Sequence, residues 1–332
     1  MLTNNSLKDI EVYKIEISAA GMRRCHNNEA VSSILPLEIL AKDVFCDLNL
    51  YPEKEYDMLI KKAAEFYKIS ADCVIATNGS DEAIDLIIRT FCNNGDKIAV
   101  LEPTFSMYEK YARISGIDIA KFSLNANFEI DLGDFCSFLE RNMPKIAFIP
   151  NPLAPSGGLT KNSDIIGIIE KFPDIVFVID EAYIEFCGQD SLIYGVKLWK
   201  NLIITRTFSK FYGLAGIRLG FCFTSQFCDI MKVKSPYNVN SISCRVGINF
   251  FNNISDIVIS KRYNGNIIAK GDMRDFLLQF DEVEKIYDSF TNFLFVKLGS
   301  SGKDFGQKLQ VEYGMVIKTF SGKFANFVRI CV

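Results

Sequence analysis

Five short apolar runs restrict the possible folds of this chain more than any other feature of its sequence. Each run is apolar throughout instead of alternating with polar residues, which is typical of strands covered on both faces. Helical segments lie between the runs, as the spacing of Ile165, Ile168 and Ile169 indicates for residues 163–171. The pattern predicts an α/β domain with a mainly parallel sheet, in which ligands bind beyond the carboxyl ends of the strands. The five runs are Lys97 to Leu101, Lys145 to Pro150, Ile175 to Ile179, Leu202 to Thr205 and Leu219 to Phe223.

The pattern changes after Gly220, and this change predicts a second, smaller domain. Residues 243–251 are expected to open a long helix, and the segments Phe293 to Leu298 and Val311 to Thr319 are expected to be strands. Residues 72–77 are expected to be a short connecting segment. The predicted division is a large domain of residues 33–240 and a small domain made of residues 241–332 with an N-terminal arm, residues 1–32.

The composition excludes several functional classes. Of 332 residues, 49% are hydrophobic, and 37 Lys and Arg nearly balance 40 Asp and Glu, so no basic surface for nucleic acid is expected. No apolar run approaches the roughly 20 residues that cross a bilayer, and the first residues lack the apolar core of a signal peptide. Ten cysteines without a C-x-x-C pair predict reduced thiols in the cytoplasm. A single histidine excludes a multi-histidine metal centre, and no metal site is predicted.

The stretch from Thr207 to Gly220 contains the lysine on which the functional interpretation rests. Lys210 lies in the loop that leaves a predicted buried strand, where a lysine is costly unless it has a role. The hydroxyls of Thr207 and Ser209, together with Arg218 and three glycines, suit a phosphate group held beside a reactive amine. Desolvation lowers the pKa of a lysine and makes it a nucleophile, which commonly forms a Schiff base with an aldehyde. A surface lysine on a glycine-containing loop is the alternative.

Residues 78–82, with the sequence Asn-Gly-Ser-Asp-Glu, predict a helix start that suits an anion. Apolar residues recur with helical spacing from Ile84 to Phe91, so a helix is expected to begin at Ser80 or Asp81. The free backbone N–H groups at such a start, preceded by a glycine, form a phosphate site. An ordinary helix cap is the alternative.

Polar residues cluster after three of the predicted strands, and Asp180 is the most informative of them. It ends the run Ile175 to Ile179, where an acid needs a partner. A structural salt bridge is one interpretation, and a carboxylate that keeps a heterocyclic nitrogen protonated is the other. Residues 27–29, Asn-Asn-Glu, predict a turn that either lines a site or has no further role.

Taken together, these residues resemble the fold type I pyridoxal-phosphate enzymes and, among them, the histidinol-phosphate aminotransferase family. The resemblance runs from about Asn28 to Arg329 and implies a sheet of about seven mainly parallel strands between helices, with a smaller α+β domain. It rests on a spaced set that is more specific than any one member. The set is Asn78 to Glu82, Asp180 to Tyr183, Thr207 to Lys210, Gly216 to Gly220 and Pro236 to Asn240.

The resemblance implies a catalytic role for three residues. Lys210 would form a Schiff base with pyridoxal phosphate and would then move a proton as general base and acid. Asp180 would keep the pyridine nitrogen protonated, which makes the ring an electron sink. Tyr183 would donate a hydrogen bond to the ring oxygen beside the Schiff base.

The resemblance also implies which residues bind the cofactor and the substrate. Tyr108 would stack on the face of the ring, and Tyr51 would reach the cofactor phosphate from a second subunit. Arg329 would bind a substrate acid as a bidentate fork. The cofactor-binding set is therefore Ser80, Asp81, Tyr108, Thr207, Ser209, Arg218 and Tyr51, and the substrate-binding set is Arg329, Asn28 and Lys318.

The sequence departs from the family pattern in three places. Ala154 stands where the family has an asparagine that hydrogen-bonds the ring oxygen, which leaves that oxygen to Tyr183 or to water. Losing one such bond would cost roughly 0.5–1.5 kcal/mol. Lys318 stands where the family often has an arginine, which affects substrate phosphate binding. The chain ends at Val332, where family members usually continue into another helix, so the small domain is expected to be trimmed.

The resemblance therefore implies a cytoplasmic, homodimeric aminotransferase with shared active sites. It would move an amino group between glutamate and a small phosphorylated ketone, such as imidazole acetol phosphate or dihydroxyacetone phosphate. The alternative on the same scaffold is a decarboxylase of an O-phosphorylated amino acid, similar to threonine-phosphate decarboxylase. A nicotinamide dehydrogenase is excluded because no predicted strand is followed by G-x-G-x-x-G.

Overall fold

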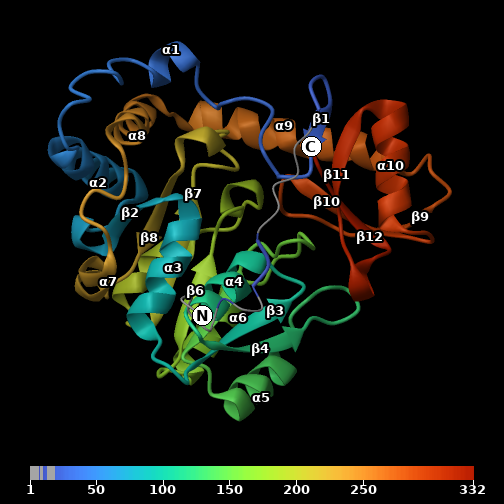
Figure 1. Cartoon of the computed structure of the whole chain (residues 1–332), viewed down its shortest axis with the longest axis horizontal. Coiled ribbons are helices and arrows are strands. Elements are labelled where there is room, and N and C mark those ends of the chain that lie inside the picture. Colours follow the sequence, from blue (N-terminus) through green and yellow to red (C-terminus); the bar gives the residue numbers. More distant parts are fainter. Residues whose placement is uncertain (1–6, 8–9, 13–18) are drawn as a thin grey trace.

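The described part of the chain forms two sheets, the larger of which has seven strands (Figure 1). A computed structural model describes residue 7, residues 10–12 and residues 19–332. The strand order is β2-β8-β7-β6-β5-β3-β4, and all neighbours run parallel except β8, which is antiparallel to β2 and β7. The predicted α/β fold with a mainly parallel sheet is confirmed. The strands are β2 (Val74–Asn78), β3 (Lys97–Glu102), β4 (Asp118–Ser123), β5 (Ile146–Pro150), β6 (Val176–Asp180), β7 (Leu202–Thr207) and β8 (Leu219–Phe223).

The reversed direction of β8 follows from the length of the chain that precedes it. A parallel crossover needs about a dozen residues or more and usually contains a helix. Residues 208–218, between β7 and β8, are too few for a crossover helix and form a loop with a short 3-10 turn, Ala215–Ile217. The chain therefore returns beside β7 in the opposite direction. This keeps the loop that carries Lys210 at the carboxyl edge of the parallel strands.

Helices cover both faces of the large sheet because alternate strand residues point to opposite sides. On β2, Val74 and Ala76 pack into a core with α2, α5, α6 and α8, whereas Ile75 packs into a second core with α3, α4 and α7. Among the described residues, the α-helices are α1 (Leu37–Leu40), α2 (Glu53–Tyr67), α3 (Gly79–Phe91), α4 (Ser106–Ile114), α5 (Leu132–Asn142), α6 (Asn162–Lys171), α7 (Phe227–Val233), α8 (Ser241–Asn253), α9 (Asp256–Leu277) and α10 (Gly302–Tyr313).

The second sheet is built from both ends of the chain. Its strand order is β1-β11-β12-β10-β9, with β1 parallel to β11 and the other neighbours antiparallel. In Figure 1 this sheet and α10 lie beside the large sheet, and the long helix α9 runs between the two parts. The strands are β1 (Arg23–Cys25), β9 (Val283–Ile286), β10 (Phe293–Leu298), β11 (Met315–Thr319) and β12 (Phe327–Cys331).

Helix α8 follows the predicted domain boundary at residue 240, yet it packs on the large domain. Phe250 of α8 lies 4.7 Å, between ring centroids, from both Phe208 and Tyr212. The side chain of Asn249 donates to the carbonyl oxygen of Leu40, at the end of α1, at 3.0 Å. We therefore propose a domain boundary after α8 rather than before it. The part of the predicted N-terminal arm before residue 19 lies largely outside the described residues.

Two predictions of local structure were wrong. The segment 72–77, expected as a connection, contains most of the edge strand β2, which pairs with β8 along its whole length. The segment 311–319, expected as one strand, is divided at Gly314. This glycine has φ +64°, a left-handed cap that ends α10, and β11 starts at the next residue.

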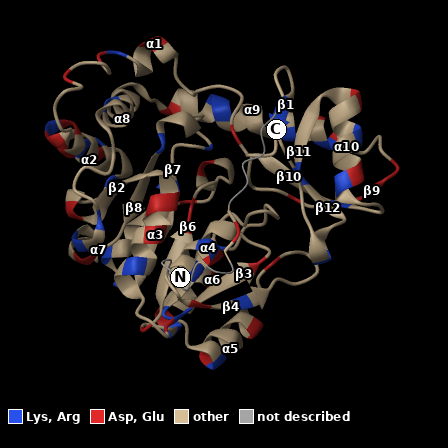
Figure 2. Cartoon of the chain, in the orientation of Figure 1, with Lys and Arg blue, Asp and Glu red and all other residues tan. Residues whose placement is uncertain are grey.

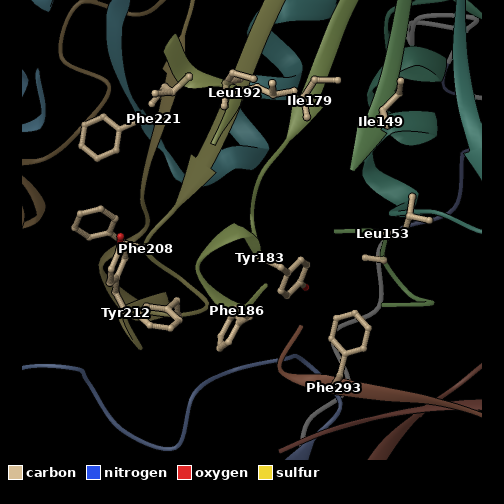
Figure 3. Close-up of a cluster of buried hydrophobic side chains, with 14 of the residues drawn as sticks. Ile149, Leu153, Ile179, Tyr183, Phe186, Leu192, Phe208, Tyr212, Phe221 and Phe293 are labelled. Carbon is tan, nitrogen blue, oxygen red and sulfur yellow. The ribbon is translucent and has the colours of Figure 1, made fainter. Parts of the chain in front are cut away.

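Aromatic side chains anchor the loop that follows β7. Phe208, Phe211 and Tyr212 are fully or almost fully buried, and Phe208 packs against Tyr212 with the ring centroids 5.0 Å apart (Figure 3). Because these rings flank Lys210 in sequence, their burial fixes the backbone from which the lysine projects. Figure 2 shows that the strands of the large sheet are mostly uncharged, while both signs of charge are interspersed over the outer helices. No helix among the described residues is long and apolar enough to span a bilayer.

Candidate active site

All of the predicted site residues except Tyr51 line one cavity of about 500 Å³. The cavity lies at the carboxyl ends of β3, β5, β6 and β7, at the place where α/β sheets bind ligands. The small domain closes it with the arm residues 27–29 and with residues 318, 320 and 329. Of the residues named from the sequence, those in the lining are Asn28, Ser80, Asp81, Tyr108, Asp180, Tyr183, Thr207, Ser209, Lys210, Arg218, Lys318 and Arg329.

Asp180 is a buried carboxylate held by neutral groups. It ends β6 and is 5% exposed. The hydroxyl of Tyr108 donates to its Oδ2 at 2.6 Å, and the backbone N–H of Ala182 donates to its Oδ1 at 3.2 Å. Burial raises the pKa of Asp180, while these hydrogen bonds lower it in part. Such a carboxylate is best stabilised by a cationic N–H group from a ligand in the cavity.

The loop after β7 places the amine of Lys210 beside the N-terminal arm. Its Nζ donates to the carbonyl oxygen of Asn27 at 2.9 Å. A tight turn follows, in which the N–H of Gly213 donates to the carbonyl of Lys210 at 3.1 Å. Gly213 has φ +67°, and a Cβ there would collide with the backbone carbonyl of Ser32, so only glycine fits this turn. The turn directs the lysine into the cavity.

Hydrogen-bond donors gather at the start of α3, where residues 78–82 predicted an anion site. The guanidinium of Arg218 contacts the carboxylate of Asp81 at 3.1 Å and the hydroxyl of Ser209 at 3.4 Å. Gly79 has φ +74°, and a Cβ there would lie 2.6 Å from the Arg218 guanidinium. The missing side chain lets the arginine approach the first N–H groups of the helix. These N–H groups, the arginine and the hydroxyls of Ser209 and Thr207 form a set of donors for a phosphate.

Two cations on the small domain form the opposite wall of the cavity. Lys318 of β11 and Arg329 of β12 face each other across the strand pair. A terminal nitrogen of Arg329 donates to the carbonyl oxygen of His26 at 2.7 Å, and its guanidinium lies 5.2 Å from the ring centroid of Phe293. Both side chains are cationic, the type of group that binds an anionic substrate.

Tyr51 is the one predicted residue that does not line the cavity. Its side chain is exposed, and its ring stacks on that of Tyr237 with 4.4 Å between the centroids and 13° between the planes. The pair lies on the surface near the start of α2, where the Tyr237 hydroxyl donates to Glu53 at 3.2 Å. The expectation that Tyr51 serves the site of a second subunit stays a prediction.

Sequence reasoning missed two features of the cavity. The ring of Tyr108 is fully buried and stacks on Phe148, with 4.7 Å between the ring centroids. Its hydroxyl donates a hydrogen bond to Asp180, a role that no motif indicated. Phe105 and Phe320 also line the cavity. Phe105 belongs to a polar-aromatic cluster after a predicted strand, and that position was the signal available for it.

A buried ion network lies directly behind Asp180. The carboxylate of Glu181 accepts from Arg206 at 3.1 Å, from the hydroxyl of Ser191 at 2.5 Å and from the N–H of Leu192 at 2.8 Å. Arg206 also contacts Glu185 at 2.6 Å. Because side chains alternate along a strand, Glu181 faces away from the cavity while Asp180 faces into it. The network therefore secures the strand end that carries Asp180.

Replacing Tyr108 with phenylalanine is expected to weaken cofactor binding at the acidic end of the pH range. The lost hydrogen bond stabilises the ionised carboxylate of Asp180, so its loss raises the pKa of Asp180 further. The carboxylate is then protonated at a higher pH, and affinity for a cationic ligand nitrogen falls earlier as the pH decreases. Titrating cofactor affinity against pH for the two proteins tests this. An unchanged acid limb would show that the hydroxyl does not tune Asp180.

Comparison with known proteins agrees with this geometry. The model of the family described as aminotransferase class I and II matches residues 36–332. The chain belongs to this family and is a pyridoxal-phosphate-dependent aminotransferase. It is 32% identical to the histidinol-phosphate aminotransferase of Clostridium novyi, over 97% of this chain and 88% of that one. It is 36% identical to that of Christiangramia forsetii, over 86% and 81%. Within the aminotransferases, it is therefore a member of the histidinol-phosphate aminotransferase family.

Solved structures share the fold. The histidinol-phosphate aminotransferase from Clostridium acetobutylicum superposes with a TM-score of 0.83 at 24% identity, over 93% of both chains. The L-threonine-O-3-phosphate decarboxylase from Porphyromonas gingivalis superposes with a TM-score of 0.79 at 21% identity, over 93% of this chain and 94% of that one. At these identities the likeness extends to the fold and does not separate transamination from decarboxylation.

The residues of the cavity fit pyridoxal phosphate. The buried carboxylate of Asp180, with its neutral partners, matches a protonated ring nitrogen. The donor set at the start of α3 matches a phosphate, and the amine of Lys210 matches an aldehyde. These three groups line the same cavity.

Proposed function

We propose that this enzyme moves an amino group between glutamate and a small phosphorylated ketone, with imidazole acetol phosphate as the first candidate. The observation that carries the proposal is that Lys210, Asp180, Lys318 and Arg329 line one and the same cavity. The names of the relatives at 32–36% identity support the choice of substrate. Dihydroxyacetone phosphate, a smaller ketone of the same class, is the second candidate.

Pyridoxal phosphate supplies an electron sink that stabilises negative charge at the substrate carbon beside the amino group. Asp180 would hold the ring nitrogen in its protonated form, and Lys210 would supply the amine for the aldehyde and for moving the proton at that carbon. Tyr183 would donate to the ring oxygen. The burial of these groups strengthens each interaction because water is excluded.

The other cavity residues bind the two phosphates and the carboxylate. Ser80, Thr207, Ser209 and Arg218 hold the cofactor phosphate, and Asp81 orients the arginine through their ion pair. Arg329 binds the carboxylate of glutamate as a fork, and the same wall offers charge to the substrate phosphate. Asn28 and Lys318 complete the substrate side of the cavity.

An assay of the purified enzyme tests this function directly. Histidinol phosphate and 2-oxoglutarate are supplied together, and glutamate formation is measured. The expected result is glutamate formation that depends on pyridoxal phosphate. Parallel reactions with O-phosphothreonine, without a keto acid, are examined for carbon dioxide. Carbon dioxide release without any amino transfer would replace the aminotransferase function with that of a decarboxylase.

We also propose that the enzyme is a homodimer whose subunits share their active sites. Exposed apolar side chains gather along residues 45–58, at Phe45, Leu48, Leu50, Tyr51 and Met58. An apolar surface of this kind suits a subunit interface. The stacked pair of Tyr51 and Tyr237 would then bring the Tyr51 hydroxyl to the cofactor phosphate of the partner.

A mixture of two variants tests whether the two subunits share their active sites. Tyr51→Ala should weaken the affinity for pyridoxal phosphate by about tenfold or more, since a hydrogen bond to a charged group contributes about 1.5–3 kcal/mol. A hybrid of Tyr51→Ala with Lys210→Ala contains one site with both residues intact. Activity of the mixture at limiting cofactor should therefore exceed that of either variant alone. A mixture no more active than its parents, or a monomer in sedimentation, contradicts the shared site.

A cytoplasmic location is proposed on the chemistry of the cysteines. All ten are unpaired thiols, and several are buried in the core. A reducing compartment keeps such thiols in this state.

A further inference from the structure

Three consecutive residues of the N-terminal arm, His26, Asn27 and Asn28, touch three side chains of the active site. The carbonyl of His26 accepts from Arg329 at 2.7 Å, and the carbonyl of Asn27 accepts from Lys210 at 2.9 Å. The side chain of Asn28 donates from Nδ2 to the hydroxyl of Tyr183 at 2.8 Å. Of these contacts, only the last is made by the arm's own side chain, so it depends on the identity of that residue.

The Asn28 side chain is built into the site. It is 1% exposed, and its backbone lies in the left-handed region at φ 55°, which asparagine tolerates better than most residues. The side chain of Asn292, next to β10, donates to the Asn28 carbonyl at 3.1 Å. Since β1 just before it pairs with β11, the small domain holds Asn28 from two sides. The Oδ1 of Asn28 has no hydrogen-bond partner among the described residues, so this buried amide uses only its donor side.

The position of Tyr183 makes this donor consequential. Its ring is held between domains, at 5.3 Å and 90° to the ring of Phe293 on β10 (Figure 3). A phenol has one proton to donate and oxygen lone pairs that accept. Because the hydroxyl oxygen accepts from Asn28, its proton stays available for a group in the cavity. Acceptance of one hydrogen bond also strengthens donation of the next.

The apolar side chain of Ala154 makes the hydrogen bond from Asn28 to Tyr183 more important. It is 8% exposed and lines the same cavity, where it offers only a methyl group. No hydrogen bond to the ring oxygen can come from this side chain. Tyr183 is thus the side chain that remains to donate a hydrogen bond to the ring oxygen. The strength and the direction of that hydrogen bond depend on Asn28.

We propose that Asn28 is a positioning residue for Tyr183, which directs the tyrosine proton toward the cofactor ring oxygen and offsets the absence of a polar side chain at position 154. The inference rests on the proposed function, because it requires pyridoxal phosphate in this cavity. It also links the small domain, which carries Asn28, to the electronic state of the cofactor on the large domain.

The test uses the pH at which the visible absorption of the cofactor-loaded enzyme changes, and the dissociation constant of pyridoxal phosphate. The colour changes when the nitrogen that joins lysine to cofactor loses its proton, and a donor at the neighbouring ring oxygen stabilises the form without that proton. Asn28→Gly removes the donor while tolerating the left-handed backbone. It is expected to raise the absorption midpoint by about half to one pH unit, the equivalent of one hydrogen bond. Cofactor affinity should fall in parallel.

A double-mutant cycle separates positioning from a general structural effect. Tyr183→Phe should raise the midpoint by at least as much, and the double variant should show no further rise, because Asn28 acts through the Tyr183 hydroxyl. Ala154→Asn should suppress the effect of Asn28→Gly by supplying a second donor. If Asn28→Gly does not fold, Asn28→Asp replaces it, since it keeps the shape and the backbone preference but lacks the donor.

The outcomes separate this inference from the function on which it rests. A wild-type enzyme that binds the cofactor, with an Asn28→Gly midpoint equal to its own, overturns the inference alone. The inference is also overturned if the midpoint shifts of Asn28→Gly and Tyr183→Phe add fully in the double variant. A wild-type protein that takes up no pyridoxal phosphate overturns the proposed function and this inference together.

Discussion

Replacing Lys210 with alanine is expected to lower the rate of amino transfer by on the order of 10²–10⁴-fold, the usual contribution of a positioned acid or base. The lysine amine is the one primary amine in the loop after β7 that lines the cavity, and it donates to the Asn27 carbonyl at 2.9 Å. Lys210→Arg retains the positive charge but lacks a nucleophilic amine, so it should be equally inactive. The proposed phosphate donors at the start of α3 remain intact in both variants, and cofactor should still bind without a covalent bond.

Borohydride reduction locates the covalent bond independently of turnover. It should attach the cofactor to Lys210 in the wild type, as peptide mapping by mass spectrometry would show. Lys234 is the appropriate internal comparison, because burial lowers its pKa but it lies outside the cavity. Label on Lys234, or none on either lysine, would remove the basis for the proposed mechanism.

The sequence predicted the large sheet well because its strands carry an unambiguous signal. The runs at β3, β5, β6, β7 and β8 are apolar on both faces, as buried strands must be. The edge strand β2 was missed because only four apolar or small residues, Val74 to Thr77, separate a short turn from α3. Its pairing with β8 is a long-range contact that no local pattern shows.

The division of residues 311–319 shows a second limit. Val311 and Tyr313 look strand-like, and both are exposed at the end of α10. Gly314 was the available signal, since a glycine after a helical stretch commonly adopts the left-handed cap conformation. The β-propensity of the residues around this glycine favours a strand and so competes with the stop signal.

The candidate site was predicted as a set of residues but not as a set of contacts. Motif spacing identified Asp180 and Tyr108 separately, whereas the hydrogen bond between them joins residues 72 positions apart. The bond from Asn28 to Tyr183 spans 155 positions. Both contacts arise from how β3, β6 and the N-terminal arm are placed by the two sheets. Sequence spacing indicates which groups are present, and only the fold determines which of them touch.

Replacing Arg206 with methionine is expected to lower the free energy of unfolding by about 3–5 kcal/mol, the usual effect of removing one partner from a buried ion pair. Arg206 is 6% exposed and Glu181 is 2% exposed. Without the guanidinium, the buried carboxylate of Glu181 and the mostly buried carboxylate of Glu185 would have no cation between them. The lost packing of the guanidinium over the ring of Tyr67, now 5.1 Å from its centroid, adds to the effect.

Equilibrium unfolding in urea measures this loss, and two further variants identify its cause. Lys232→Met removes an exposed ion pair with Asp229 and should leave the unfolding midpoint nearly unchanged. A triple variant, Arg206→Met, Glu181→Leu and Glu185→Met, removes every charge of the network and should recover much of the stability, because the penalty comes from unpaired buried charge. A triple variant as unstable as Arg206→Met would assign the loss to packing instead. Since Glu181 directly follows Asp180 at the end of β6, Arg206→Met should also weaken cofactor binding, whereas Lys232→Met should not.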